Sequence, residues 1–557
     1  MKKLAITLAL LVAAGYVGWQ NRLDLLLWAA PKLTELRTPV APNQPVNWQQ
    51  GPEVATQSPA ERPPNIILIL ADDLGFNDIS LTNGGAADGS LQTPSIDSLA
   101  AAGTQFTNGY AANAICAPSR ASLMTGRYSS RFGFEYTPIF KLGPRIFQWM
   151  EDLEPSDPPM LIDLDVTASL PPMEELGMPA EEVTIAEALK QQGYYTAHIG
   201  KWHLGTGTGM RPEEQGFDDS LYMKGTLYQP ADHPEVVNAR VHGDAIDNMI
   251  WATGNYAAQF NGSEPFAPDG YLTDYYTREA VKVIEANRNQ PFFLYLAHWG
   301  VHNPLQASRA DYEALSHIKD HRLRVYAGMI RALDRSVAKI NAALEEHGLS
   351  DNTLVIFSSD NGGAGYLGLP DLNKPYRGWK LSHFEGGTHV PFLMRWPAQI
   401  PAGGTVTEPA HHIDLFHTIA AAAGTPVPDD RKLDGIDLLP AMRGEVDANL
   451  QRPLFWRQGH QQSVLSEGWK LIRAAQPDKP GAGPQKFLFH LAADPTEQRD
   501  LSAEQPEKVA ELEALLAAHN AEQVPPAWPS AMQAPILIDK TTNEVTEAGD
   551  TYLYWPN

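Results

Sequence analysis

The chain has 557 residues, of which 43% are hydrophobic and 19% charged, a composition typical of a globular protein. This length exceeds that of a single hydrophobic core, so we expect one large domain and a smaller one. Its 66 acidic and 42 basic residues give a formal net charge of -24, which disfavours nucleic acid and anionic membrane surfaces as partners. The single cysteine, Cys116, excludes an intrachain disulfide framework.

Residues 1–30 are typical of an export signal peptide or an N-terminal membrane anchor. Lys2 and Lys3 precede an apolar stretch from Leu4 to Trp19, which is slightly shorter than the roughly 20 apolar residues of a spanning helix. An apolar segment recurs from Leu25 to Ala30, so a retained anchor stays open beside a cleaved signal. We therefore expect a periplasmic or secreted protein, free or anchored at its N-terminus. Residues 31–64 are predicted to be a linker, because their later part is rich in Pro and Gln.

Four short apolar runs predict strands that are buried on both faces of a sheet. They are Asn65 to Leu70, Tyr194 to Ile199, Phe292 to Ala297 and Leu354 to Phe357. Helical patterns lie between them: one starts at the capping box formed by Thr184 and Glu187 and stops at Gly193, and another spans about Ala310 to His347. This alternation predicts an α/β fold with a large, mostly parallel sheet between helices.

Each of the four predicted strands is followed by polar residues. In chain order these are Asp72 and Asp73, Lys201 and His203, His298 and His302, and Asp360 and Asn361. Because ligand sites in parallel sheets form at the carboxyl ends of the strands, we expect these side chains to meet in one site.

The oxygen donors of this set predict a metal site. Asp72, Asp73, Asp360 and Asn361 are hard ligands, which favour Ca²⁺ or, less strongly, Mg²⁺. Two adjacent buried carboxylates also resist joint ionisation unless a cation lies between them. Histidine pairs such as that of His298 and His302 leave zinc open. An isolated Asp-Asp pair is more commonly a turn or a helix cap, so the prediction depends on the joint placement after strands.

Positive charges and imidazoles complete the candidate site. Arg120, Lys201 and Lys380 supply the charge that an oxyanion needs, and Pro118 suits the first turn of a helix, whose N-terminus also attracts anions. His203 and His302 are candidates for proton transfer, because imidazole titrates close to neutral pH. Either histidine alone would more often be a hydrogen-bonded structural residue.

The run Cys116-Ala117-Pro118-Ser119-Arg120 resembles the signature of the type I sulfatases. For a lone cysteine the alternative is a small buried hydrophobe. Further motifs of that family follow in the same order along the chain. They are Asp72-Asp73, Thr93-Pro94-Ser95-Ile96-Asp97, Gly200-Lys201-Trp202-His203-Leu204-Gly205, Ser359-Asp360-Asn361-Gly362, Arg377-Gly378-Trp379-Lys380, Leu433-Asp434-Gly435 and Asp494-Pro495-Thr496-Glu497-Gln498.

The resemblance implies an alkaline-phosphatase-like α/β sandwich. Its catalytic domain would cover residues 65–452, and a smaller C-terminal subdomain with an antiparallel sheet and a tail would cover residues 453–557. Within the latter we expect strands around Ser463 to Ile472 and Phe487 to Leu491, and a helix from Pro506 to His519. The tail from Val524 to Asn557 is expected either to strap across the domain or to contact a partner.

The resemblance also implies a sulfuric ester hydrolase that releases an alcohol and inorganic sulfate from an aryl or carbohydrate sulfate. In that family a formylglycine-generating enzyme oxidises the motif cysteine, here Cys116, to Cα-formylglycine, which then carries a covalent sulfo-enzyme intermediate. The implied roles distribute over the motif residues as follows. Ca²⁺ would be held by Asp72, Asp73, Asp360, Asn361 and position 116. The hydrated aldehyde would be oriented by Arg120 and Lys201. Lys380 and His302 would hold the sulfate, and one of these two would protonate the departing oxygen, while His203 would remove a proton from the second hydroxyl.

Two other functions stay open on the sequence alone. A phosphonate monoester or phosphodiester hydrolase of the same superfamily would carry the same motifs, and a non-catalytic binder of sulfated glycans is a further alternative. The segments from Tyr136 to Met178 and from Asp218 to Tyr271 are long and elaborate. We expect both near the mouth of the pocket, where they would shape substrate choice, with surface ornament as the alternative. No oligomeric state is predicted.

Overall fold

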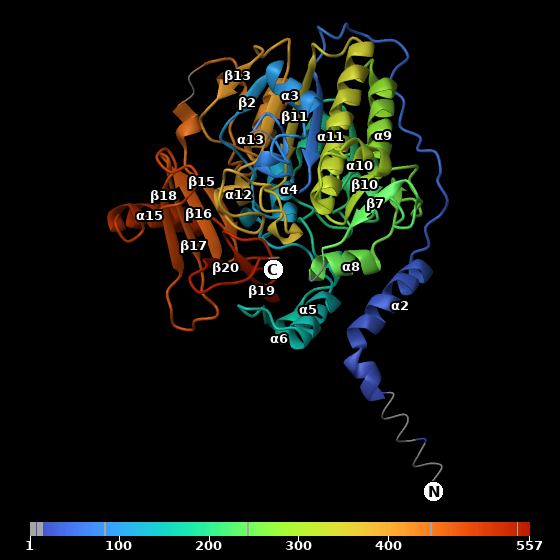
Figure 1. Cartoon of the computed structure of the whole chain (residues 1–557). Helices are drawn as coiled ribbons and strands as arrows, with labels where there is room; N and C mark the ends of the chain where they lie inside the picture. The colour runs from blue at the N-terminus through green and yellow to red at the C-terminus, as the bar shows by residue number, and fades with distance from the viewer. Residues whose placement is uncertain (1–6, 8–14, 83–84, 242–243, 446–447, 543) are drawn as a thin grey trace.

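The computed structural model describes Thr7 and residues 15–557, apart from residues 83–84, 242–243, 446–447 and 543 (Figure 1). The predicted apolar stretch that starts at Leu4 therefore lies largely outside the described residues. Within the described part of the chain, no helix combines the length and apolar character needed to cross a membrane.

A nine-stranded sheet forms the centre of the molecule, with the order β13-β2-β12-β11-β1-β9-β5-β6-β8. Its inner strands are β1 (Asn65–Ala71), β11 (Thr353–Ser359), β9 (Phe292–Ala297) and β5 (Tyr195–Gly200), all parallel to their neighbours within this group. The outer strands are β13 (Gly404–Val406), β2 (Thr104–Phe106), β12 (Phe392–Arg395), β6 (Asp219–Met223) and β8 (Ala258–Phe260). The antiparallel pairs involve β12 and β8, towards the edges. The predicted large, mostly parallel sheet and its four inner strands are confirmed.

Helices cover both faces of this sheet, because alternate side chains of β1 are apolar in both directions. Ile67 and Ile69 pack into one core with α3 (Pro94–Ala101), α9 (Leu272–Asn287) and α11 (His321–Glu346). On the opposite face, Ile66 and Leu68 pack with α4 (Cys116–Thr125), α7 (Ile185–Gln191) and α13 (Asp414–Ala423). The sandwich of helix, sheet and helix layers follows directly from this pattern.

The predicted helix boundaries are partly confirmed. At α7 the Thr184 hydroxyl accepts a hydrogen bond from the Glu187 amide, and the Glu187 carboxylate accepts one from the Thr184 amide, as the capping box predicts. The single helix predicted from Ala310 to His347 is wrong, because the structure has α10 (Arg309–Ala314) and then α11. The break occurs where the Asp320 carboxylate caps the Leu323 amide and starts a new helix.

Shorter elements connect these layers. They are β3 (Gly109–Tyr110) with β14 (Ala410–His411), β7 (Val236–Ala239) with β10 (Leu305–Ser308), α5 (Leu142–Leu153), α6 (Leu164–Ser169), α8 (Ala245–Thr253), α12 (Glu385–Thr388) and α14 (Leu439–Met442). Single 3₁₀ turns lie at η1 (Phe76–Asp78), η2 (Ser129–Arg131), η3 (Met173–Glu175), η4 (Pro212–Glu214), η5 (Gly365–Leu367) and η6 (Ala448–Gln451).

The C-terminal part contains a separate four-stranded antiparallel sheet. Its strands are β15 (Leu454–Gln458), β16 (Gln461–Ser466), β17 (Trp469–Ala474) and β18 (Gln485–His490), in that order. Helix α15 (Pro506–Ala521) packs Leu512 and Leu516 onto Val464, Leu471 and Leu488 of this sheet. The strand predicted around Phe487 to Leu491 and the predicted helix are confirmed. The strand predicted from Ser463 to Ile472 is instead the hairpin of β16 and β17, because the chain turns at Glu467 and Gly468.

The C-terminal tail straps across the large domain. Strand β19 (Met532–Leu537) pairs with β20 (Tyr552–Pro556) and with β4 (Leu161–Ile162), which belongs to the long segment from Tyr136 to Met178. Figure 1 shows β19 and β20 beside α5 at the lower end of the molecule. Of the two expectations for the tail, the strap is the one observed.

Residues 31–64, predicted to be a linker, are not free of the domain. Helix α2 (Arg22–Arg37) runs through the expected boundary at residue 31 and lies against α8. Further on, the backbone of Ala41 bonds to Pro265, and the buried Trp48 donates a hydrogen bond from Nε1 to Glu279 on α9 at 2.9 Å. The buried indole of Trp48 therefore anchors this segment to the domain. The Pro and Gln content of the segment gave no indication of this contact.

A buried lysine joins the two parts of the molecule. Lys470 on β17 places Nζ 2.7 Å from Glu385 on α12 and 3.0 Å from Glu497, and none of the three side chains is more than 2% exposed. Burying two carboxylates is costly unless a cation is paired with them. The contact between the C-terminal sheet and the large domain therefore depends on this lysine.

We expect Lys470→Met to lower the free energy of unfolding by about 3–5 kcal/mol, because it leaves two buried carboxylates without their cation. The matched control is Lys486→Met on β18, whose partly exposed ammonium lies 2.7 Å from Glu513 and whose loss should cost less than about 1 kcal/mol. Urea denaturation of both variants checks this. Equal losses in the two proteins would contradict the assignment.

Candidate active site

Polar residues from several elements converge at the carboxyl ends of the inner strands. Asp72 and Asp73 follow β1, Asp360 and Asn361 follow β11, and Lys201 follows β5. Gly200 permits this convergence, because it has a φ of 109° and a Cβ at this position would lie 1.9 Å from the carbonyl oxygen of Ala297 on β9. A glycine is therefore required where the chain turns Lys201 into the site.

Arg120 on α4 lies between two of the carboxylates. Its Nε donates to Asp360 Oδ2 at 2.8 Å, and its Nη2 lies 3.4 Å from Asp72 Oδ2. Lys201 Nζ lies 2.6 Å from the same oxygen of Asp72, and the remaining oxygen of Asp360 accepts a bond from the Asp73 amide at 3.2 Å. Since these side chains are almost wholly buried, each carboxylate depends on these cations for its charge balance.

Asp73 is the second centre of contacts. Lys380 Nζ lies 2.7 Å from its carboxylate, Asn361 Nδ2 donates to Oδ1 at 2.8 Å, and His302 Nε2 lies 3.7 Å from Oδ2. The hydroxyl of Tyr366 donates to Oδ2 at 3.2 Å and also accepts from Lys380 at 3.2 Å. Tyr366 was not among the predicted site residues, although its position a few residues after Asn361 was a signal that could have suggested it.

Cys116 is the first residue of α4 and faces this cluster. Its Sγ lies 3.5 Å from Asp72 Oδ1 and 3.7 Å from Asp73 Oδ1. Burial, together with the charge of Asp360, raises the pKa of the Cys116 thiol well above its ordinary value. An unmodified thiol in these surroundings is protonated and is a weak nucleophile.

The carboxylates differ in their protonation equilibria. Burial and the charge of Asp360 raise the pKa of Asp72 to about 7. Burial also opposes the ionisation of Asp73 and Asp360, but the ammonium of Lys380 beside Asp73 and the guanidinium of Arg120 beside Asp360 outweigh it and lower both pKa values. Asp72 is therefore the carboxylate of the site that ionises least readily beside the protein's own cations.

The two candidate histidines are both buried at the site. His302 stacks on Trp299 with ring centroids 4.0 Å apart, and its Nδ1 donates to the Asn303 carbonyl at 2.7 Å, which leaves Nε2 directed towards Asp73. Burial lowers the pKa of His302 to about 3, and burial together with the charge of Lys201 lowers that of His203. Both imidazoles are therefore neutral. His298, by contrast, bonds to Ser336 at 2.9 Å, on α11.

The donor set fits a divalent metal ion. Asp72, Asp73, Cys116 and His302 each place a ligand atom within 4.8 Å of the others. In addition, Oδ1 of the buried Asn361 has no hydrogen-bond partner among the described residues. An unpaired amide oxygen beside carboxylates is suited to a hard cation, which would also offset the repulsion between these carboxylates. Of the predicted ligands, Asp360 lies outside the four-residue group. His302, predicted to hold the sulfate or transfer a proton, lies inside it.

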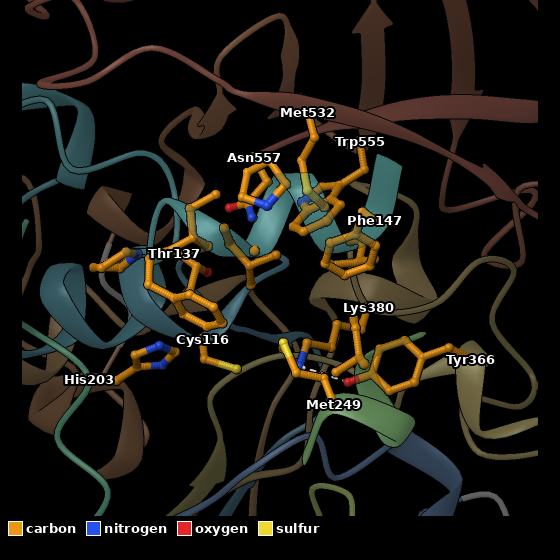
Figure 2. A pocket seen from close by; sticks show the side chains of 18 of the residues that line it. Cys116, Thr137, Phe147, His203, Met249, Tyr366, Lys380, Met532, Trp555 and Asn557 are labelled. Carbon is orange, nitrogen blue, oxygen red and sulfur yellow. Dashed lines mark hydrogen bonds between the residues drawn. The ribbon is translucent and has the colours of Figure 1, made fainter. Parts of the chain in front are cut away.

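A cavity of about 250 Å³ opens above Cys116. His203, Tyr366 and Lys380 lie at its inner end, while Phe147, Met532 and Trp555 line the opposite wall (Figure 2). His302 lines the cavity as well. Both long segments reach the cavity as predicted, the first through seven residues between Thr137 and Phe147 and the second through Ile246 and Met249. The tail residues of this wall had no local sequence signal, because only strand pairing far from the motifs brings them here.

Comparison with known proteins agrees with this site. Residues 64–425 match the family model described as Sulfatase. The N-acetylgalactosamine-6-sulfatase of Canis lupus familiaris is 31% identical over 475 residues, covering 80% of this chain and 82% of that protein. Steryl-sulfatase of Mus musculus is 32% identical over 541 residues, covering 81% of this chain and 80% of the relative.

Solved structures agree as well. The crystal structure of Ps i-CgsB in complex with k-i-k-neocarrahexaose matches with a TM-score of 0.68 and 30% identity, covering 84% of this chain and 95% of that one. The fold expected from the motifs is thus the observed one. Because the family model covers more than half of the chain and its motif residues line one buried site, the chain belongs to the sulfatase family of alkaline-phosphatase-like fold.

Proposed function

We propose that this protein hydrolyses a sulfate ester to an alcohol and inorganic sulfate at position 116. The observation that carries the proposal is the placement of Cys116 at the inner end of the cavity, between the Asp72 and Asp73 carboxylates and within the same cluster as three buried cations. A sulfate group entering the cavity would meet Lys380 beside Cys116.

The proposed nucleophile is Cα-formylglycine, made from Cys116 by a formylglycine-generating enzyme. When present, the hydrated aldehyde would supply a hydroxyl that attacks the ester sulfur, while the bond from sulfur to the alcohol oxygen breaks and the alcohol leaves with a proton from Lys380 or His302. Loss of the proton of the second hydroxyl would then release inorganic sulfate and restore the aldehyde. The protonated thiol of Cys116 is a poor nucleophile for this reaction. Arg120 and Lys201 are suited to fix the orientation of position 116, because both contact Asp72, whose carboxylate lies beside Cys116.

The remaining cavity residues provide charge and proton transfer. Lys380, whose pKa the charge of Asp73 raises despite burial, keeps its ammonium and is proposed to hold the sulfate. His302 Nε2 lies 3.7 Å from Oδ2 of Asp73, an oxygen that Lys380 also contacts. Nδ1 of the buried His203 has no hydrogen-bond partner among the described residues, so a proton from position 116 could be accepted there.

Ca²⁺ is the proposed metal ion. Asp72, Asp73, Asp360 and Asn361 supply hard oxygen atoms, which suit Ca²⁺ better than a softer metal, and position 116 lies beside them. A bound cation would polarise a sulfate oxygen. Mg²⁺ is the second choice, since it demands stricter octahedral geometry.

Two alternatives are less well supported. A phosphonate monoester or phosphodiester hydrolase would use the same charges, but the relatives at about 30% identity are named sulfatases. A non-catalytic binder of sulfated glycans would have no need of Arg120, Lys201, His203 and Lys380 all around Cys116. Parallel assays on aryl sulfate and aryl phosphonate esters separate these functions.

The first prediction concerns the conversion of Cys116 to formylglycine and its effect on activity. Protein produced together with the maturation enzyme should show a loss of about 18 Da at the tryptic peptide that contains Cys116, and the product should react with a hydrazide. It should hydrolyse 4-nitrophenyl sulfate, whereas Cys116→Ala should lose at least about 10³-fold in kcat/KM. Protein made without the maturation enzyme is the matched control. Equal activity of modified and unmodified protein would contradict the proposal.

Metal removal gives the second prediction. Dialysis against a Ca²⁺-selective chelator should abolish hydrolysis, and added Ca²⁺ should restore it more fully than Mg²⁺ or Zn²⁺. Asn361→Ala should weaken Ca²⁺ binding by about 10–100-fold in a titration. Its control is Asn289→Ala, a residue that bonds only to Pro52 and Glu53 at the surface. Full recovery with zinc but not calcium would refute the assignment.

We also propose that the protein is exported to the periplasm or beyond, with its N-terminal segment as a signal or an anchor. Large apolar side chains of this region lie in solvent, with Trp19 61% and Trp28 65% exposed. Cell fractionation should find the protein outside the cytoplasm, and deletion of residues 2–30 should retain it inside. Carbonate washing of membranes then separates an anchored from a released form. A cytoplasmic full-length protein would overturn this proposal.

A further inference from the structure

The wall of the cavity that faces away from the sulfate end is apolar. It is built from separate parts of the chain, by Ile139, Phe140 and Phe147 on and before α5, Ile246 on α8, and Met532 and Trp555 of the tail. Met249 on α8 also lines the cavity, and Figure 2 shows it toward Lys380 and Tyr366. Figure 2 shows Met532, Trp555 and Phe147 across the cavity from Cys116 and His203. Because the sulfate must lie beside Cys116, this wall is where the alcohol part of the ester would rest.

Charge is concentrated at the opposite end. Among the described residues that line the cavity, Lys380 is the sole side chain with a permanent charge, and it belongs to the sulfate end. Thr137 and Asn557 are the uncharged polar side chains of the remaining wall. A sugar sulfate presents several hydroxyl groups, each of which loses water on entry and needs a partner.

The polar atoms of this wall are few. Nε1 of Trp555 and Oδ1 of Asn557 are buried and have no hydrogen-bond partner among the described residues. Trp555, Asn557 and Thr137 supply the polar side-chain groups of this wall. Hydroxyls distributed around a pyranose ring would therefore not all find a partner here. The rest of the wall is apolar, so burying an apolar ligand surface against it makes the free energy of binding more favourable.

We propose that the alcohol released by this enzyme is predominantly apolar, an aromatic or alicyclic ring system rather than a sugar. This inference rests on the proposed hydrolysis of sulfate esters, and it narrows the substrate class of the same site. It departs from the N-acetylgalactosamine named for one relative, because substrate choice resides in the segments that build the apolar wall and not in the shared motifs.

The test compares two sulfate esters whose alcohols differ in polarity but are similar as leaving groups. Cyclohexylmethyl sulfate and galactose 6-sulfate are both esters of primary alcohols, so differences in the leaving group largely cancel. Binding is measured by calorimetry on Cys116→Ala protein with its metal, which needs no turnover. We expect cyclohexylmethyl sulfate to bind at least about 10-fold more tightly. The ratio of kcat/KM on the mature enzyme should change in the same direction.

Variants inside and outside the apolar wall provide the control. Phe147→Ala, or Met532→Ala if the first variant folds poorly, should reduce the preference for cyclohexylmethyl sulfate by about 10-fold. Leu153→Ala should leave it unchanged, because Leu153 is an exposed residue of α5 and is not part of the cavity lining.

The outcomes separate this inference from the proposed function. Galactose 6-sulfate binding as tightly as cyclohexylmethyl sulfate or more tightly, or no binding of either ester, overturns the inference. A preference that is equal in the Phe147→Ala, Met532→Ala and Leu153→Ala proteins overturns it as well. Selective binding of cyclohexylmethyl sulfate without turnover of either ester by formylglycine-containing protein upholds the inference and refutes the hydrolase function.

Discussion

The balance of buried charge at the carboxyl edge of the central sheet is the constraint on which the rest of the structure depends. Asp72, Asp73 and Asp360 are buried within contact distance of Arg120, Lys201 and Lys380. Each of these charges would be costly alone. Their mutual proximity requires that β1 and β11 be adjacent, that α4 begin opposite them, and that β5 turn sharply at its end.

A metal ion and an oxyanion both fit this balance. The pKa of Asp72 is raised to about 7 while that of Asp73 is lowered, so the carboxylates have capacity for more positive charge. Cys116 lies between these carboxylates and the open cavity. The buried charges of the site raise the free-energy cost of folding, and the same charges suit the site to bind a cation and a sulfate together.

The residues proposed to select the alcohol belong to a different part of the molecule from the residues proposed to carry out the reaction. The charged residues sit on strand ends and at the start of α4, which the sheet holds rigidly. The apolar wall is built from α5, α8 and the tail, and β19 fastens that tail to β4 inside one of the long segments. A reactive centre held on strand ends, with the wall that faces the alcohol built from other segments, separates the chemistry of the site from the choice of alcohol.

The sequence by itself determined the strands, the order of the motifs and most of the charged site. Mainly apolar runs favour burial of β1, β5, β9 and β11, and the polar residues that follow these parallel strands then share one edge of the sheet. Only the tertiary structure decided that Tyr366 joins Asp73, that Trp48 ties the predicted linker to α9, and that Met532 and Trp555 complete the cavity. These contacts join residues far apart in the chain through packing and strand pairing, for which local periodicity carries no signal.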